Sequence, residues 1–194
     1  MRQDHSSSSD HASGRPLAGE YADYAAADIA SVPGDDAVEA LRHARAETLT
    51  LLRPLTGRSA DGLAYAPGKW TVKEVVGHLI DDERIFVYRA LCLARGDTRE
   101  LAGFDQDAYV PPGGFEQRTL ADLLDEYEAV REATIRFFTG LPADAWQRRG
   151  RVNGYGASVR GLAYHIVAHE LHHQRVLRSH YLAAGSMAPS EGRI

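Results

Sequence analysis

Apolar residues recur every three or four positions in four stretches of this chain. The stretches span residues 36–53, 71–96, 119–140 and 158–181. This spacing predicts amphipathic helices, each with one apolar face. No stretch alternates with period two, as a half-buried strand would, and no internal repeat is visible. We therefore expect an all-α protein whose four helices form an up-down four-helix bundle.

Local signals mark where these helices begin. Each predicted helix directly follows a residue whose side chain can cap free backbone N–H groups: Asp36, Thr71, Thr119 and Ser158. The second start is the most strongly marked, because Glu74 completes a capping box with Thr71. The loops between the helices are long and contain several Gly and Pro residues. We expect them to cover one end of the bundle and to shape a pocket there.

Composition and charge narrow the class of protein. The chain has 194 residues, of which 44% are hydrophobic, and we assign residues 19–185 to a single domain. Residues 1–18 are predicted to be a disordered arm and residues 186–194 a flexible tail. The net charge of −5 argues against a nucleic-acid partner, and no segment is apolar enough for a membrane helix. The single Cys92 and the lack of a signal peptide suit a cytoplasmic protein.

The fourth stretch carries the most informative residues of the chain. His169 and His173 are four positions apart, so on a helix both imidazoles lie on one face and can bind one metal ion. Both also lie near the centre of the apolar face. Burial of two imidazoles without strong partners would cost several kcal/mol, on the order of what transfer data give for polar groups. The spacing therefore predicts a metal site, with a core role for the histidines as the alternative.

With Glu170, the same residues match the H-E-x-x-H pattern of zinc peptidases. The extended peptidase signature requires Gly at position 176 and His at position 179, where this chain has Val176 and Ser179. Peptidases that use a glutamate from a later helix are also a poor match, because only Glu191 follows, in a short tail. A third metal ligand must therefore come from upstream, and a peptidase is disfavoured.

Three residues of the second helix are candidates for that ligand. His78 lies at the edge of the apolar face, Asp82 lies somewhat further inward, and Glu83 points to the core. Ligand type favours His78, while the helical wheel permits it without selecting it. Glu83 could instead be the buried partner of an arginine or of a metal-bound histidine. From the residues alone, we rank His78 first by ligand type and the two acids behind it.

At this point the chain resembles the DinB/YfiT-like superfamily. Residues 70–78 follow the pattern W-[ST]-x-x-[ED]-x-x-x-H, and residues 169–173 supply the late H-E-x-x-H helix. The resemblance implies a four-helix bundle with a divalent metal ion held by His78, His169 and His173. It further implies zinc or nickel as the ion, a low-molecular-weight thiol such as mycothiol or bacillithiol as a cofactor in some members, and a homodimer.

Such a site suggests two classes of function. In the first, a metalloenzyme hydrolyses a small-molecule substrate or transfers a thiol cofactor to it. In the second, the bundle binds metal without turnover, for example in a stress response. An open coordination position beside a polar pocket would favour the enzyme, and a fourth protein ligand would favour the non-catalytic protein.

Several residues around the predicted metal have roles that depend on the fold. Glu170 could act as a base, but we favour a role in orienting a ligand imidazole, for which Asp82 is equally eligible. His165 and His172 are predicted to be polar flank residues, with a place at the pocket mouth as the alternative. The arginines Arg84, Arg89 and Arg175 are predicted to be solvated, with binding of a cofactor carboxylate as the alternative.

Overall fold

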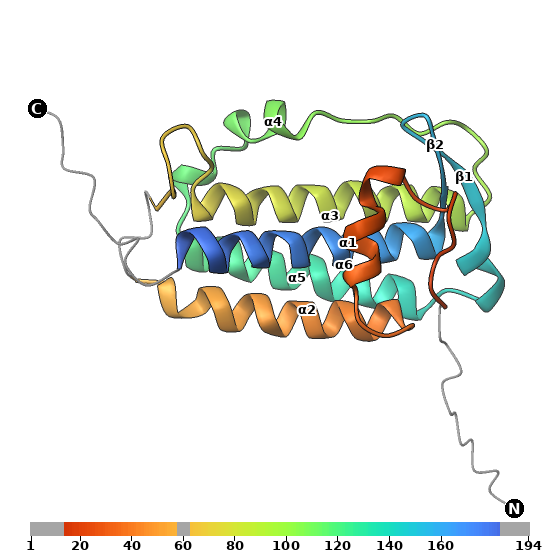
Figure 1. Cartoon of the computed structure of the whole chain (residues 1–194), viewed down its shortest axis with the longest axis horizontal. Helices are drawn as coiled ribbons and strands as arrows, with labels where there is room; N and C mark the ends of the chain where they lie inside the picture. Colours follow the sequence, from red (N-terminus) through yellow and green to blue (C-terminus); the bar gives the residue numbers. More distant parts are fainter. Residues whose placement is uncertain (1–13, 58–62, 183–194) are drawn as a thin grey trace, which may run out of the picture.

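The computed structural model describes residues 14–57 and 63–182. Four long helices lie side by side along the molecule (Figure 1): α2 (Ala37–Leu52), α3 (Val72–Ala94), α5 (Leu120–Thr139) and α6 (Val159–Val176). The predicted all-α bundle is therefore confirmed. The predicted tail at residues 186–194, and residues 1–13 of the predicted arm, lie outside the described residues. Within the rest of that arm, Arg15 donates hydrogen bonds to the carbonyl oxygens of Ile29, Val32 and Gly34.

The predicted helix starts are confirmed by their capping hydrogen bonds. The side chain of Asp36 accepts from the backbone N–H groups of Val38 and Glu39 at the start of α2. At the start of α3, Thr71 and Glu74 form the reciprocal bonds of a capping box. The side chains of Thr119 and Ser158 each accept one backbone N–H, from Asp122 at the start of α5 and from Gly161 at the start of α6. Local sequence thus determines where each long helix begins.

Helices α2 and α3 each pack against both α5 and α6. The ammonium group of Lys73, in the first turn of α3, donates to the carbonyl oxygens of Glu116 and Arg118 just before α5. Helices α3 and α5 therefore begin at the same end of the bundle and run in the same direction. The connecting segment, residues 95–119, makes this possible because it returns along the length of the bundle and includes the short helix α4 (Gln106–Tyr109) (Figure 1).

Two further elements were not predicted. A short helix, α1 (Ala26–Ser31), crosses the outside of the bundle (Figure 1), and strands β1 (Arg149–Val152) and β2 (Tyr155–Ser158) form an antiparallel hairpin. The expectation that no strand forms was wrong. Strand β1 gave no alternating apolar signal, because only one of its four residues is buried. The signal that could have identified it is Asn153-Gly154, whose positive φ angles of 47° and 83° suit a tight hairpin turn.

Shorter helical turns fill the connections. Single 3-10 turns occur at Asp23–Ala25, Arg53–Leu55, Pro111–Gly113, Phe115–Gln117 and Ala143–Gln147. A π-helical turn at Leu177–Tyr181 extends α6.

The buried carboxylate of Glu20 ties the segment before α1 to the hairpin and to α6. It accepts hydrogen bonds from Arg149, Arg160 and Ser158. Burial alone would raise the pKa of Glu20, but hydrogen bonds from Arg160, from the backbone N–H of Leu17 and from Ser158 lower it to about 2. The backbone approach is also close, because a Cβ atom at Gly161 would lie 2.0 Å from the carbonyl oxygen of Glu20. The start of α6 is therefore held from outside the bundle.

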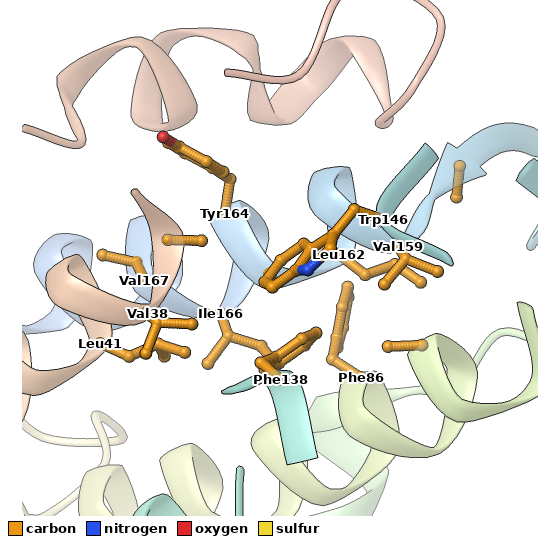
Figure 2. Close-up of a cluster of buried hydrophobic side chains, with 14 of the residues drawn as sticks. Val38, Leu41, Phe86, Phe138, Trp146, Val159, Leu162, Tyr164, Ile166 and Val167 are labelled. Atoms are coloured by element: carbon orange, nitrogen blue, oxygen red, sulfur yellow. The ribbon is translucent and has the colours of Figure 1, made fainter. Parts of the chain in front are cut away.

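The apolar core lies between the four long helices in two clusters. The cluster nearer the hairpin includes Phe86, Phe138, Trp146, Leu162 and Ile166 (Figure 2). The second cluster fills the other end, where α3 and α5 begin. Burial of each large apolar side chain contributes roughly 1.5–3 kcal/mol, so both clusters hold α3 and α6 firmly against each other. Among the described helices, none combines the length and apolarity that crossing a membrane would need.

Candidate metal centre

Three imidazoles converge between α3 and α6. His169 and His173 lie one turn apart on α6, and their Nε2 atoms are 3.1 Å apart. Helix α3 runs antiparallel to α6 and brings the Nε2 atom of His78 to 2.9 Å from that of His169. All three ligand atoms lie within 4.8 Å of one another. The position of His78 at the edge of its helix wheel is thus compatible with burial, because that edge faces α6.

These separations fit a metal ion. Nitrogens that bind one ion at about 2.1 Å are separated by about 3.0–3.4 Å, depending on the bond angle, and the separations of 3.1 Å and 2.9 Å to Nε2 of His169 are close to this range. Hydrogen bonds among the three imidazoles would explain this arrangement less well than a metal ion does. The single lone pair on Nε2 of His169 cannot accept two well-directed bonds from the other two rings. A cation attracts all three lone pairs at once. The His78 side of the site is shielded from water, since His78 is only 2% exposed and the ring of Trp70 lies 4.8 Å from its ring.

Asp82 fixes the orientation of His169. Its carboxylate Oδ2 lies 3.2 Å from Nδ1 of His169, one turn along α3 from His78. Burial lowers the pKa of His169, but the negative charge of Asp82 outweighs this effect and raises the pKa overall. Burial would raise the pKa of Asp82, but the imidazole of His169 outweighs this effect and lowers the pKa overall. We assign a proton to Nδ1 of His169, which leaves a lone pair on Nε2 for a metal ion.

The other two imidazoles are neutral over a wide pH range. Burial, followed by the charge on His169, lowers the pKa of His78 to about 4 and that of His173 to about 2. Neutral imidazoles are the form that binds a metal ion. Nδ1 of His173 is buried and has no hydrogen-bond partner among the described residues.

Glu170 does not lie at this site. Its carboxylate points into the bundle, where Oε1 accepts hydrogen bonds from Thr48 at 2.5 Å and from Tyr127, and Oε2 accepts from Arg131 at 2.6 Å. The expected contact between Glu170 and a ligand imidazole is therefore corrected. A neighbour in sequence is displaced by about 100° around the helix axis, which turns Glu170 away from the face that carries His169. Asp82 makes the orienting contact instead.

The buried charge of Arg131 is balanced by two glutamates. Besides Glu170, both oxygens of Glu83 accept from the guanidinium group, at 2.8 Å and 2.7 Å. Of the two partners considered for Glu83, an arginine and a metal-bound histidine, the structure has the arginine. Burial would lower the pKa of Arg131, but the two carboxylates raise it well above its usual value. This group therefore stays charged and links α3, α5 and α6.

A cavity of about 320 Å³ opens beside His169 and His173. His169, His173 and Asp82 form one side of it, and Tyr24, Phe104 and Tyr155 form much of the rest. His165 also lines the cavity, stacked on Phe86 with ring centroids 4.0 Å apart, so this residue takes the pocket position that was our alternative. Burial lowers the pKa of His165 to about 4, which keeps the ring neutral.

The second face of His173 borders another cavity, of about 510 Å³, which Trp70 and Tyr65 also line. The exposed His172 borders both cavities. The metal site can therefore be approached from two sides at His173. No fourth residue among those described joins the group of three possible metal ligands.

The three arginines differ in burial. Arg84 and Arg175 are about half exposed and form surface ion pairs, as predicted. Arg89 is only 4% exposed and lines the cavity of about 320 Å³, so the expectation that it is solvated was wrong. Phe86 and Phe104 cover its guanidinium group, whose carbon lies 4.7 Å and 5.6 Å from the two ring centroids.

Comparisons with known proteins agree with this fold. A family model described as the DinB superfamily matches residues 40–177, which include all three imidazoles. The solved structure of YfiT from Bacillus subtilis, described as a probable metal-dependent hydrolase with an unusual four-helix bundle topology, is similar with a TM-score of 0.65. The two are 17% identical, and the similarity covers 76% of this chain and 89% of YfiT. No curated protein sequence matches this chain.

Proposed function

Because this chain belongs to the DinB superfamily, we propose that it is a metal-dependent enzyme that acts on a small molecule. In this proposal His78, His169 and His173 hold one divalent ion, zinc or nickel. The observation that carries it is the convergence of three Nε2 atoms beside a cavity, with no fourth ligand among the described residues. A purely structural zinc site would be closed by four protein ligands.

Hydrolysis is the reaction that we favour. A divalent ion supplies Lewis acidity, which lowers the pKa of bound water towards neutrality. The residues of the chain then have distinct tasks. Asp82 keeps the imidazole of His169 in the orientation and tautomer that the ion needs. Trp70 excludes water from the buried side of His78. The cavity holds the substrate, and its volume of about 320 Å³ limits that substrate to a small molecule.

Transfer of a low-molecular-weight thiol is the second candidate. A transfer reaction needs room for two molecules, and the two cavities that meet at His173 supply it. A thiol that enters from one side would be deprotonated near the ion, and the acceptor molecule would occupy the other side. Hydrolysis needs only one organic substrate and therefore only one of the two cavities.

The test begins with the metal content of the purified protein. We expect one divalent ion per chain in the wild type and none in His173→Ala. The matched control is His172→Ala, which removes the neighbouring imidazole from the same helix; it should retain the ion, because His172 is outside the converging group. Full occupancy in His173→Ala would remove His173 from the ligand set and overturn the proposal.

Turnover is tested on the same three proteins. Hydrolysis of p-nitrophenyl acetate should occur in the wild type and cease in His173→Ala and after chelation of the ion. His172 borders the cavities but is outside the ligand group, so His172→Ala should lower the rate only in part. Titration with mycothiol and bacillithiol tests the second candidate. A protein that holds one ion, hydrolyses no small ester or amide and binds no thiol would be the non-catalytic metal-binding bundle instead.

A further inference from the structure

The bundle buries two arginines with very different partners. Arg131 is 1% exposed and contacts the carboxylates of both Glu83 and Glu170. Arg89 is 4% exposed, and no carboxylate among the described residues forms an ion pair with it. Its hydrogen bond runs from Nη2 to the carbonyl oxygen of Ala102, at 2.8 Å. Arg89 therefore carries a buried positive charge that the described part of the protein does not neutralise.

Burial of an unpaired charge is costly, so it is rarely found without a purpose. The faces of two phenyl rings offset only part of this cost, because a cation–π contact is weaker than an ion pair. The acids that line the same cavity already have cationic or hydrogen-bonding partners: Asp82 contacts His169, and Asp28 pairs with Arg175. An anion that enters the cavity would find Arg89 as its unmatched counter-ion.

The remaining lining describes the rest of such a ligand. The side chains of Tyr24, Phe86, Phe104 and Tyr155 place aromatic rings around the cavity. They suit an apolar or flat body rather than a sugar or a peptide. Arg89 is the only lysine or arginine among the residues that line this cavity. One positive charge matches a carboxylate, whereas a phosphate dianion would require a second cation.

We propose that this cavity binds a small carboxylic acid, with the carboxylate on Arg89, the apolar body between the aromatic rings and the reactive end at the three imidazoles. This inference rests on the proposed function, because it names the substrate class of the same site. A planar guanidinium can form two parallel hydrogen bonds to a carboxylate, which fixes the orientation of the ligand as well as its position. Arg89 is thus a specificity-determining residue.

The probes are benzoate, the isosteric neutral benzamide, and inorganic phosphate, each titrated calorimetrically into the full-length protein, once as the metal-loaded protein and once after removal of the metal. Benzoate should bind at least about tenfold more tightly than either other probe, because a charge-assisted pair forms with it alone. Equal binding of benzoate and benzamide would overturn the proposal without any variant. Tighter binding of phosphate than of benzoate would also overturn it, since the site would then be a general anion site.

Variants assign the effect to the residue. Arg89→Gln should abolish the preference for benzoate over benzamide, while Arg89→Lys, which keeps the charge, should retain part of it. The matched control is Arg99→Gln, because Arg99 is an exposed arginine nearby that pairs with Asp97. It should bind benzoate as the wild type does. Circular dichroism checks that each variant is folded, and a folded Arg89→Gln that keeps the preference would contradict the proposal.

The same titration in His173→Ala separates this inference from the proposed function. Benzoate binding that persists in His173→Ala and is lost in Arg89→Gln supports the carboxylate site even if no metal is bound. The opposite pattern, with the preference kept in Arg89→Gln and present only in metal-loaded protein, would mean that the carboxylate binds the ion. The metal site would then stand, and the role of Arg89 would be refuted.

Discussion

Replacement of Glu170 by Gln distinguishes a structural role from a catalytic one. The substitution keeps the size of the side chain and removes its charge. One oxygen of Glu170 accepts from Thr48 and Tyr127, and the other accepts from Arg131 at 2.6 Å. The amide oxygen of Gln can still accept from the two hydroxyl groups. Its NH₂ group, however, would face the guanidinium group, so a donor would meet a donor.

The magnitude follows from what Arg131 loses. Removal of one partner of a buried ion pair costs about 3–5 kcal/mol when the other charge is left without compensation. Here Glu83 still pairs with Arg131, at 2.7 Å, so the loss is closer to one charge-assisted hydrogen bond, about 1.5–3 kcal/mol. With the unsatisfied amide added, we expect a loss of roughly 2–4 kcal/mol in the free energy of unfolding. At about 2–4 °C per kcal/mol, Tm should fall by roughly 5–15 °C.

Urea and thermal unfolding, followed by circular dichroism, measure this loss. The control is Glu47→Gln, which removes a glutamate that is 42% exposed and pairs with Arg178 at 2.8 Å. It should lose less than about 1 kcal/mol, as surface ion pairs do. Metal content should stay at one ion per chain in both variants. If Glu170→Gln is as stable as the control but loses metal affinity or turnover, the structural role of Glu170 is refuted and this residue returns to the active site.

Three further variants test other parts of the structure. Asp82→Asn should lower metal affinity about tenfold or more, measured by competition with a chelator, because the charge that orients His169 is lost. Glu20 has a pKa of about 2 in the folded state, below its unfolded value of 4.5. Its carboxylate therefore stabilises the fold fully above pH 4.5, and this contribution to the free energy of unfolding is lost as the pH falls towards 2. Between pH 5 and about pH 2, the free energy of unfolding measured in urea should therefore fall by roughly 2–3 kcal/mol more in the wild type than in Glu20→Gln. Gly77→Ala should lower the free energy of unfolding by about 1–3 kcal/mol and therefore lower the Tm, since the added Cβ would lie 2.3 Å from the ring of Phe115. An unchanged Tm would contradict that packing.

The long helices were predictable because their signals are local. A cap such as Thr71 and its partner Glu74 lie within one turn, so sequence alone specifies the bond between them. The hairpin was missed because its stability comes from elsewhere. Val152 is buried by tertiary contacts, with a bridge to Leu101, and the strands themselves lack an apolar pattern. The direction of α5 could not be predicted from local sequence either, because it depends on the path of residues 95–119.

The residues of the candidate site were likewise predictable only where they lie on one helix. His169 and His173 could be paired from their spacing, because both belong to one helix. His78 could not be selected from its wheel position, because a helix wheel takes no account of the helix that packs against its edge. Ligand type ranked His78 ahead of Asp82 and Glu83, and the resemblance to a known superfamily then selected it. The structure brings His78 to the other two imidazoles and gives the two acids different partners, an imidazole and an arginine.

Arg89 and Arg131 illustrate the limit of such reasoning most clearly. Both are single cations within long helices, and nothing in their local sequence says that one meets two carboxylates and the other meets two phenyl rings. That difference arises when the loop that carries Phe104 folds over α3. Carboxylate partners offset the desolvation cost of a buried charge, and where they are missing a bound anion can offset it instead. We therefore expect benzoate to raise the Tm of the wild type, and not that of Arg89→Gln, in a titration followed by thermal unfolding. An equal rise in both proteins would show that the charge on Arg89 has no part in binding.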